Sequence, residues 1–390
     1  MDIPMWKARL LGLRPVLLRV LLYPTVFGFF FVTFVYFTFP YDRLAELIVA
    51  QAEAPRVTRS GVSQPSGIEL SLGSLGPTFL PGLEARDVTV TFLPQTTPGA
   101  PPPAGEGAPR PTVMRIDKLK VRLSLLPLLW GRANVSFSLQ GLQGEAEGSA
   151  SLLLEGPPPD PPLAPRPSTA PAPPAVSPGP VLTDLEVTLT NLDMGQVGPV
   201  VQAVGLPLGG RMSGTIRLEV PEGRTSQASG EIHLAVDRMT VGNGQAQYQI
   251  PGFGGVTIEQ IRAGRLDLNI TARAGVLTFE RTAAHSPEFD LAMDGRVTLR
   301  PNTADSALDL GVRFRLTDVY RNKSEQAARI LTVMEMVPDL RRARRPDGMI
   351  AFRCTGTFAR APRCLPDGRG LGATGAGGAM PVAPPAGMMP

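Results

Sequence analysis

The sequence predicts a mainly β protein: a single N-terminal transmembrane helix followed by an extended, curved antiparallel β-sheet with one or two short capping helices. Three observations predict this fold class. An uncharged apolar run occupies residues 20–39, many later segments alternate apolar and polar residues, and helical spacing is clearest at residues 323–337. About 350 residues follow the run, enough for one large domain or two ordinary ones.

The apolar run at residues 20–39 has the length and composition of a membrane anchor. A helix of this length rises about 30 Å, the hydrocarbon thickness of a bilayer. Because Phe, Val and Leu lie on all sides of it, a buried soluble helix would need a large protein to surround it. Pro24 lies near the start of the span, where proline costs little. We therefore expect one membrane crossing.

The flanking charges predict the orientation of this anchor. The leader, residues 1–19, carries four basic residues against one acid: Lys7, Arg9, Arg14 and Arg19 against Asp2. Positive flanks stay inside, so the N-terminus is expected in the cytoplasm and residues from about 41 onward outside it. The alternative is a cleaved signal peptide with an A-x-A site at residues 50–52. However, the run is longer than an ordinary signal-peptide core and ends well before that site, which favours an uncleaved anchor.

Alternation with a period of two predicts β-strands in the rest of the chain. Each such segment puts apolar residues on one side and polar residues on the other, which indicates an antiparallel sheet with one protected face and one wet face. Gly, Asn, Asp and Pro supply the turns. The predicted strands include residues 69–72, 86–92, 119–125, 134–141, 185–189, 215–220, 231–236, 265–270, 289–299 and 308–316.

Helical signals are few. The segment 323–337 has apolar residues at helical spacing and is followed by Pro338, which ends a helix. We expect it to cap the sheet. The segment 194–207 is a weaker candidate for a second helix, because it contains glycines and Pro199.

Three segments rich in Pro, Ala and Gly predict linkers or tails: residues 94–111, 157–180 and 366–390. They cannot bury enough apolar surface to order themselves. The middle segment separates a first β-rich part, residues 40–156, from a second, residues 181–365. We interpret it as a semi-rigid spacer rather than as a proline-rich ligand, because receptors for such ligands are mainly cytoplasmic.

Charge gives no support for nucleic-acid binding. The net charge is +4, but the basic residues are dispersed and no nucleic-acid-binding motif is present. The one tight basic cluster, in the sequence PDLRRARRPDG, consists of Arg341, Arg342, Arg344 and Arg345. Two interpretations stay open: a solvated turn between a helix and a strand, or a docking patch for an acidic partner or a lipid headgroup.

The two cysteines, Cys354 and Cys364, form a candidate disulfide. Outside the cytoplasm such a pair favours a disulfide over free thiols. A structural zinc site would need four ligands, and His233 and His285 are the only histidines of the chain. We therefore expect no metal site.

Catalytic patterns are missing from the sequence. His233 falls on the polar side of its predicted strand, and His285 lies in a turn-like sequence. No nucleophile elbow, phosphate-binding loop, metalloprotease or dinucleotide-binding motif occurs. The sequence thus predicts no catalytic residue and no cofactor.

Three stretches carry a family resemblance: FPYDRLAELI at residues 39–48, residues 116–152, and residues 308–358. With the preceding anchor they resemble the type II secretion system protein N family, GspN, in its longer, myxobacterial-type form. The second stretch, with LSLLPLLWGR between two strands, also resembles the AsmA family of envelope proteins, whose long curved sheets are associated with lipid traffic. The linkers and the alanine-glycine tail depart from the shorter enterobacterial form, so partner contacts are not carried over.

The resemblance implies a single-pass inner-membrane protein with its bulk in the periplasm. The first hypothesis is an accessory role in the type II secretion system, with contacts to other components through strand edges, the helix at 323–337 and the arginine cluster. The second is lipid binding or transfer, which requires the faces of Leu266, Phe289 and Leu310 to line an open trough rather than a closed core. The third hypothesis is an enzyme, and it is disfavoured because no nucleophile, base and orienting residue can be assembled from the sequence.

Overall fold

The computed structural model describes most of the chain between residues 22 and 367. The leader at residues 1–19, the segments 94–111 and 157–180 and the tail from residue 368 lie outside the described residues. The described ranges are 22–23, 25–31, 33–34, 36–54, 56–57, 63–64, 67–78, 82–93, 112–154, 181–198, 200–201, 206–245, 247–250, 254–300, 305–358 and 360–367.

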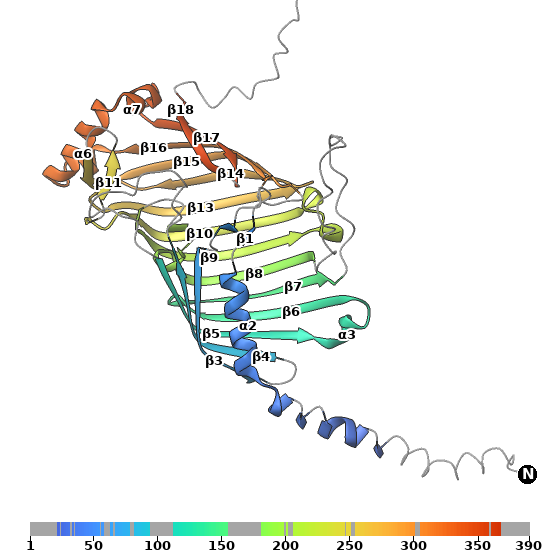
Figure 1. Cartoon of the computed structure of the whole chain (residues 1–390). Coiled ribbons are helices and arrows are strands. Elements are labelled where there is room, and N and C mark those ends of the chain that lie inside the picture. Colours follow the sequence, from blue (N-terminus) through green and yellow to red (C-terminus); the bar gives the residue numbers. More distant parts are fainter. Residues whose placement is uncertain are drawn as a thin grey trace, which may run out of the picture.

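One antiparallel sheet of 14 strands dominates the structure (Figure 1). Its order is β18-β17-β16-β15-β14-β13-β10-β9-β8-β7-β6-β5-β4-β3, so neighbours in the chain are neighbours in the sheet except where β11 and β12 intervene. The strands are β3 (Ile68–Thr78), β4 (Gly82–Phe92), β5 (Thr112–Ser124), β6 (Arg132–Gly141), β7 (Gly144–Leu153), β8 (Val181–Asp193), β9 (Leu208–Glu219), β10 (Ser229–Val241), β13 (Ile261–Arg273), β14 (Val276–His285), β15 (Phe289–Thr298), β16 (Ala307–Leu316), β17 (Ile350–Thr357) and β18 (Arg360–Pro366).

Two short strand pairs and several helices lie outside the main sheet. Two short pairs stand apart from it: β1 (Arg56–Val57) with β2 (Ser63–Gln64), and β11 (Gln247–Ile250) with β12 (Gly254–Thr257). The helices include α2 (Tyr41–Glu53), α3 (Leu125–Leu128), α5 (Asp318–Arg321), α6 (Glu325–Met336) and α7 (Pro338–Ala343), with the 3-10 turns η1 (Met194–Gln196), η2 (Pro221–Gly223) and η3 (Thr225–Gln227). The prediction of a mainly β protein with a large antiparallel sheet is confirmed.

The two predicted β-rich parts belong to one sheet. The strands on either side of residues 157–180, β7 and β8, are direct neighbours, with Ala146 opposite Leu189 and Ala150 opposite Leu185. The proline-rich segment therefore connects two adjacent antiparallel strands, and the sheet continues across the predicted boundary.

The structure does not confirm the predicted single transmembrane helix at residues 20–39. Among the described residues, no single helix is long and apolar enough to cross a membrane; Thr25–Thr38 and Tyr41–Glu53 meet the criteria of length and composition only as a pair, bent by 58°. Pro40 stands at this break with ψ of 79°, outside the helical range. Residues 20–21, 24, 32 and 35 of the predicted span lie outside the described residues.

Helix α2 protects one edge of the sheet. It packs against the edge strand β3, and the Glu53 carboxylate accepts a hydrogen bond from the Leu70 backbone N–H at 3.2 Å. The half-buried side of α2 repeats at helical spacing: Tyr41, Leu44, Ala45, Val49 and Ala52. An unpaired edge strand invites further strands, so this cover restricts edge pairing at β3.

The predicted helix at 323–337 is confirmed as α6. Ser324 caps its first turn, accepting a hydrogen bond from the Ala327 backbone N–H at 3.1 Å, and Pro338 begins α7 directly after it. The segment 194–207 holds the 3-10 turn η1, and several residues after that turn lie outside the described part of the chain.

Helices α5 and α6 are fastened to one end of the sheet by polar contacts with residues 257–260. Tyr320 is fully buried and donates a hydrogen bond to the Glu259 carbonyl at 3.1 Å; burial raises its pKa to about 12. Lys323 Nζ donates to the Gln260 carbonyl at 2.7 Å, and Ser324 hydrogen-bonds the Glu259 carboxylate. The main core lies beneath these helices and includes Met194, Leu208, Val236, Met239, Ile261, Ala263, Leu266, Ala284, Phe289, Tyr320 and Ala327.

Ion pairs cross the polar face of the sheet. Arg217 pairs with Glu186 at 2.9 Å, and both side chains are largely exposed. Asp290 is different because its side chain is only 8% exposed, and it binds both Arg315 and His285 from the neighbouring strands. Burial alone would raise the pKa of Asp290, but the hydrogen bonds from Arg315 and His285 outweigh burial and lower the pKa below its ordinary value.

The first prediction concerns this buried carboxylate. Because its pKa in the folded protein lies below the ordinary 3.8, Asp290 stabilises the fold fully above that pH, and the contribution is lost as the pH falls through the lower, folded value. We expect Arg315→Met to lower the free energy of unfolding by about 2 kcal/mol at pH 7, because it leaves the carboxylate short of a charged hydrogen-bond partner. Urea unfolding measures this loss. The exposed-pair control Arg217→Met should cost about 0.5 kcal/mol or less, and equal losses in both variants would contradict the prediction.

Candidate functional site

A continuous apolar row crosses the whole sheet. Each of the 14 strands contributes one residue to an unbroken series in which every member lies directly opposite the members on the adjacent strands. All 14 residues are apolar, glycine or cysteine. We call this set the middle row. It comprises Pro77, Leu83, Val121, Phe137, Gly148, Val187, Ile216, Ile232, Ile270, Phe279, Gly295, Leu310, Cys354 and Cys364.

The middle row is half-buried rather than sealed. Only Ile270 falls in the buried class, at 7% exposed, whereas the residues from Leu83 to Ile232 and from Phe279 to Cys354 keep intermediate exposure. With strands about 4.8 Å apart, the row extends about 60 Å across the sheet. One leaflet of a bilayer is about 15 Å of hydrocarbon, so the row exceeds the length of an acyl chain several times.

Phe137 and Gly148 show how the row is kept smooth. A Cβ atom on Gly148 would lie 2.6 Å from Phe137 Cζ and 2.4 Å from the Glu186 carbonyl oxygen, so no larger residue fits there. The aromatic ring thus lies across the neighbouring strand where a side chain would otherwise stand. The result is an unbroken apolar surface between β6 and β8.

One end of this face is closed. Leu266 and Phe289 are 5% and 9% exposed and belong to the core under α5 and α6, whereas Leu310 is half-buried in the middle row. The open trough expected of a lipid-handling sheet is therefore lined by Leu310 but not by Leu266 or Phe289. The apolar face is filled at the helix-covered strand ends and open along its middle.

The arginine cluster is divided by the fold. Arg341, Arg342 and Arg344 are exposed, and Arg345 is half-buried. Arg344 lies 3.9 Å from Glu335, and Arg345 lies 3.9 Å from Asp347. A small depression of about 70 Å³ runs beside α7, and its rim includes Arg315, Arg321, Glu335, Arg341 and Arg344. The surface is basic, but its four arginines differ in exposure and in their acidic neighbours.

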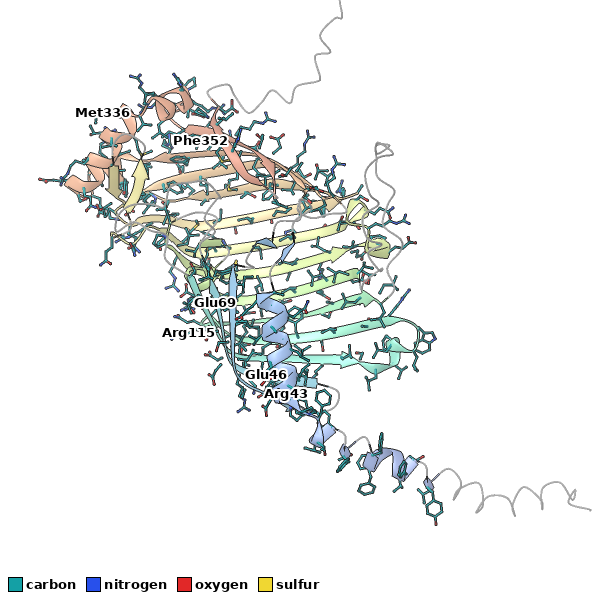
Figure 2. All side chains as sticks on the ribbon, in the orientation of Figure 1. Arg43, Glu46, Glu69, Arg115, Met336 and Phe352 are labelled. Atoms are coloured by element: carbon teal, nitrogen blue, oxygen red, sulfur yellow. A yellow bond between two sulfur atoms is a disulfide. The ribbon has the colours of Figure 1, made fainter. Side chains whose placement is uncertain are left out.

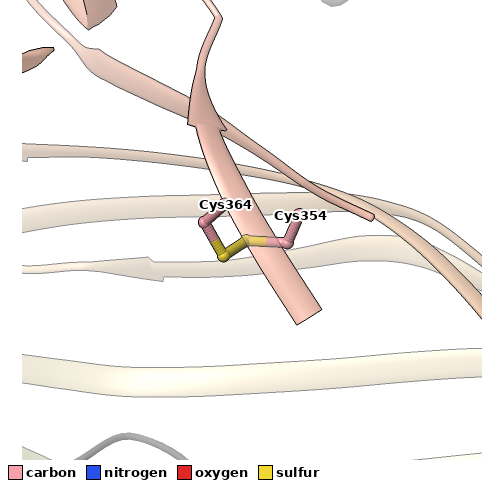
Figure 3. The surroundings of a disulfide bond; sticks show 2 residues. All are labelled: Cys354 and Cys364. Atoms are coloured by element: carbon pink, nitrogen blue, oxygen red, sulfur yellow. A yellow bond between two sulfur atoms is a disulfide. The ribbon is translucent and has the colours of Figure 1, made fainter. Parts of the chain in front are cut away.

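The two cysteines are brought together at the β18 edge (Figure 3). Cys354 on β17 and Cys364 on β18 lie directly opposite each other, and the structure joins them as a disulfide with an S–S distance of 2.01 Å. They end the middle row. The bond closes a separation of 10 residues and ties the edge strand to the sheet.

The two histidines lie on different strands and have separate partners. His233 is on the polar face of β10, where its ring hydrogen-bonds the Asn269 side chain at 2.9 Å and lies 3.3 Å from Glu231. The pKa of His233 is raised above its ordinary value, mainly by the hydrogen bond with Asn269 and then by Glu231. His285 ends β14 rather than lying in a loop, and hydrogen-bonds Asp290. Within the part of the chain that the structure describes, no three His, Cys, Asp or Glu side chains are placed to hold a metal ion.

A wider depression of about 550 Å³ lies on the polar face over β5 to β8. Acidic and basic side chains share its lining, among them Lys120, Arg122, Glu147 and Glu186. Because opposite charges stand side by side, this surface favours neither anions nor cations.

The second prediction concerns the disulfide. In the chain-entropy model, a bond closing about 10 residues stabilises the fold by roughly 2–3 kcal/mol. We expect Cys364→Ser to lower the free energy of unfolding by this amount, measured by urea titration. Reduction with dithiothreitol should bring the wild-type protein to the same value and leave the variant unchanged. A wild-type protein insensitive to reduction would contradict the prediction.

Comparison of the chain with protein-family models, with curated proteins and with solved structures found no match.

Proposed function

We propose that this chain is a non-catalytic protein anchored in the bacterial inner membrane, with its body in the periplasm, and that the apolar face of its sheet binds the acyl chains of phospholipids. The observation that carries the proposal is the middle row: a half-exposed apolar surface crossing every strand of the sheet. Removing such a surface from water stabilises a complex by about 25 cal/mol per Å² of apolar area, so an apolar ligand that covers the row would be bound favourably.

An acyl chain suits this surface chemically. The middle row contains no charged or hydrogen-bonding side chain, so it offers contacts without direction, which a flexible hydrocarbon chain can satisfy. The row is also far longer than one chain, so several lipids could lie along it. Binding of this kind needs neither catalytic group nor cofactor, which agrees with the sequence-based expectation of no enzyme activity.

The anchor is supported by exposure. Large apolar side chains between residues 22 and 39 stand free of the body: Leu22, Tyr23, Val26, Phe27, Phe29, Phe30, Phe31, Phe34, Phe37 and Phe39 are between 43% and 73% exposed. A contiguous apolar surface of this size indicates a membrane or protein contact. With the uncharged composition of residues 20–39 and the basic leader, a bilayer is the partner we propose, with the N-terminus in the cytoplasm.

The accessory role in the type II secretion system is the second candidate. It is favoured by the resemblance of residues 39–48, 116–152 and 308–358 to GspN and by the basic surface beside α7. In this role the sheet holds other secretion components near the inner membrane. Met336, 52% exposed on α6, adds an apolar contact at the same end.

The third prediction tests lipid binding. Val187 is half-buried in the middle row, whereas its neighbour Thr188 is exposed on the polar face of the same strand. We expect Val187→Gln to weaken phospholipid binding about tenfold, because the new amide meets hydrocarbon without a hydrogen-bond partner at a cost of about 1–2 kcal/mol. Phospholipid that co-purifies in mild detergent, quantified by mass spectrometry, measures this loss. Thr188→Gln is the matched control and should retain the wild-type amount.

The same purification separates the two candidates. Bound phospholipid without other secretion components supports the lipid-binding function. Enrichment of type II secretion components without stoichiometric lipid overturns it in favour of the accessory role.

The fourth prediction belongs to the accessory role. We expect Arg341→Ser/Arg342→Ser to reduce co-purification of secretion components about fivefold, because charges at the rim of an interface contribute to association. The bound lipid should not change. Arg217→Ser, on the polar face of β9, is the control for loss of an exposed arginine. Unchanged component recovery in the α7 variant would count against docking at this surface.

A further inference from the structure

An apolar tip projects from the sheet between β5 and β6. It consists of residues 125–130, the short helix α3 and the two residues after it. Four of its side chains are exposed to unusual degrees: Leu125 58%, Leu126 70%, Leu129 81% and Trp130 70%. Outside residues 22–39, no other stretch of six residues among those that the structure describes gathers as many exposed large apolar side chains.

The fold itself does not need these apolar residues. The backbone of the tip is satisfied locally: Leu129 N–H donates to the Leu126 carbonyl, Trp130 N–H to the Pro127 carbonyl at 3.0 Å, and Gly131 N–H to the Leu128 carbonyl. Gly131, with φ of 72°, then turns the chain into β6. Polar side chains could occupy positions 125, 126, 129 and 130 with the same backbone. Their apolar character therefore points to a contact outside the body.

The flanks of the tip suit a lipid surface. Exposed Arg122 and Arg132 stand on the two strands that carry the tip, and Trp130 lies between them in the chain. Leucine side chains enter the acyl region, tryptophan prefers the headgroup level, and arginine reaches the phosphates. A protein partner would not require this order of apolar, aromatic and basic groups.

The tip lies at the same corner of the sheet as the apolar N-terminal segment. The hydroxyl of Tyr36, near the end of that segment, donates a hydrogen bond to the Gly82 carbonyl at 3.3 Å. Gly82 starts β4 and lies directly opposite Arg122, three residues before the tip. A Cβ atom on Gly82 would come within 3.1 Å of Arg122 Cγ. In Figure 1 the segment leaves the body in the same lower part of the view in which α3 projects.

We propose that the apolar tip inserts into the interface of the bilayer that holds residues 20–39, as a second membrane contact of the body. Leu125, Leu126 and Leu129 enter the boundary of the acyl region, Trp130 lies at headgroup level, and the two arginines bind phosphate oxygens. The proposal rests on the membrane anchor of the proposed function and does not depend on lipid binding by the middle row. It fixes the strand ends of β5 and β6 at the membrane surface.

The fifth prediction uses tryptophan fluorescence in the full chain. Trp6 and Trp130 are the two tryptophans, so Trp6→Phe leaves Trp130 as the reporter. The protein is reconstituted into phosphatidylethanolamine–phosphatidylglycerol vesicles with or without bromine on the acyl chains. We expect brominated lipid to quench Trp130 emission about twofold, because the ring lies at interfacial depth, and aqueous iodide to quench it weakly.

A matched control places the reporter elsewhere. In Trp6→Phe/Trp130→Phe/Met336→Trp, the single tryptophan is on exposed α6, which Figure 2 shows far from Arg43 and Glu46 of α2. We expect its emission to be insensitive to brominated lipid and open to iodide. In Trp6→Phe/Leu126→Asp/Leu129→Asp, Trp130 should lose its bromine quenching while the protein still floats with the vesicles.

Three outcomes would overturn the proposal. If brominated lipid does not quench Trp130 emission and iodide does, the tip lies in water. Emission that ignores both quenchers, together with cross-linked dimers, places the tip against a second copy of the chain. Failure of the wild-type protein to float with vesicles refutes the anchor, and this readout is separate from loss of co-purified lipid, which concerns the middle row alone.

Discussion

Strand register is the constraint on which the rest of this structure depends. Side chains alternate with a period of two, so a slip of one residue in any strand would move its apolar residues to the polar face. The pairing instead keeps Val187 opposite Ile216, Ile216 opposite Ile232 and Ile232 opposite Ile270, and the same row continues to both edges. Ion pairs such as Arg217 with Glu186 reinforce the register from the polar side. Apolar packing and charge pairing therefore select the same alignment.

A single sheet of this kind cannot bury both faces by itself. Helices α5 and α6 cover the strand ends near Leu266 and Phe289, where the fully buried Tyr320 and Ala327 complete a closed core. The middle of the apolar face has no comparable cover among the described residues, because α2 packs against β3 and α7 against β17 and β18. The uncovered part is the surface on which we propose that acyl chains bind. Stability and proposed function thus draw on different parts of one face.

The sequence predicted those features that depend only on the residues within one segment. Segments such as 231–236 and 308–316 show their alternation without reference to neighbours, and Pro338 marks the end of α6. Strand β14 was not predicted because a bulge between Phe279 and Thr282 breaks its period. His285 was expected in a loop because the sequence around it is turn-like. The pairing of β7 with β8 was not predicted, because it joins strands that are distant in the sequence. The middle row was not predicted for the same reason: it depends on strand register, which the pattern within one segment does not specify. The helix Tyr41–Glu53 was not predicted, and the break at Pro40 separates it from the apolar run at residues 20–39.

The two edges of the sheet face different environments under these proposals. At the β3 side, Tyr36 ties the apolar N-terminal segment to Gly82, and the apolar tip follows from the neighbouring strand. At the β18 side, about 60 Å away along the middle row, stand the disulfide and the arginine-rich α7. A membrane contact at one edge therefore presents the other edge to the periplasm, with the apolar face running between them. Lipid taken up near the membrane and a partner bound at α7 would use opposite ends of one sheet, so the two candidate functions do not compete for the same surface.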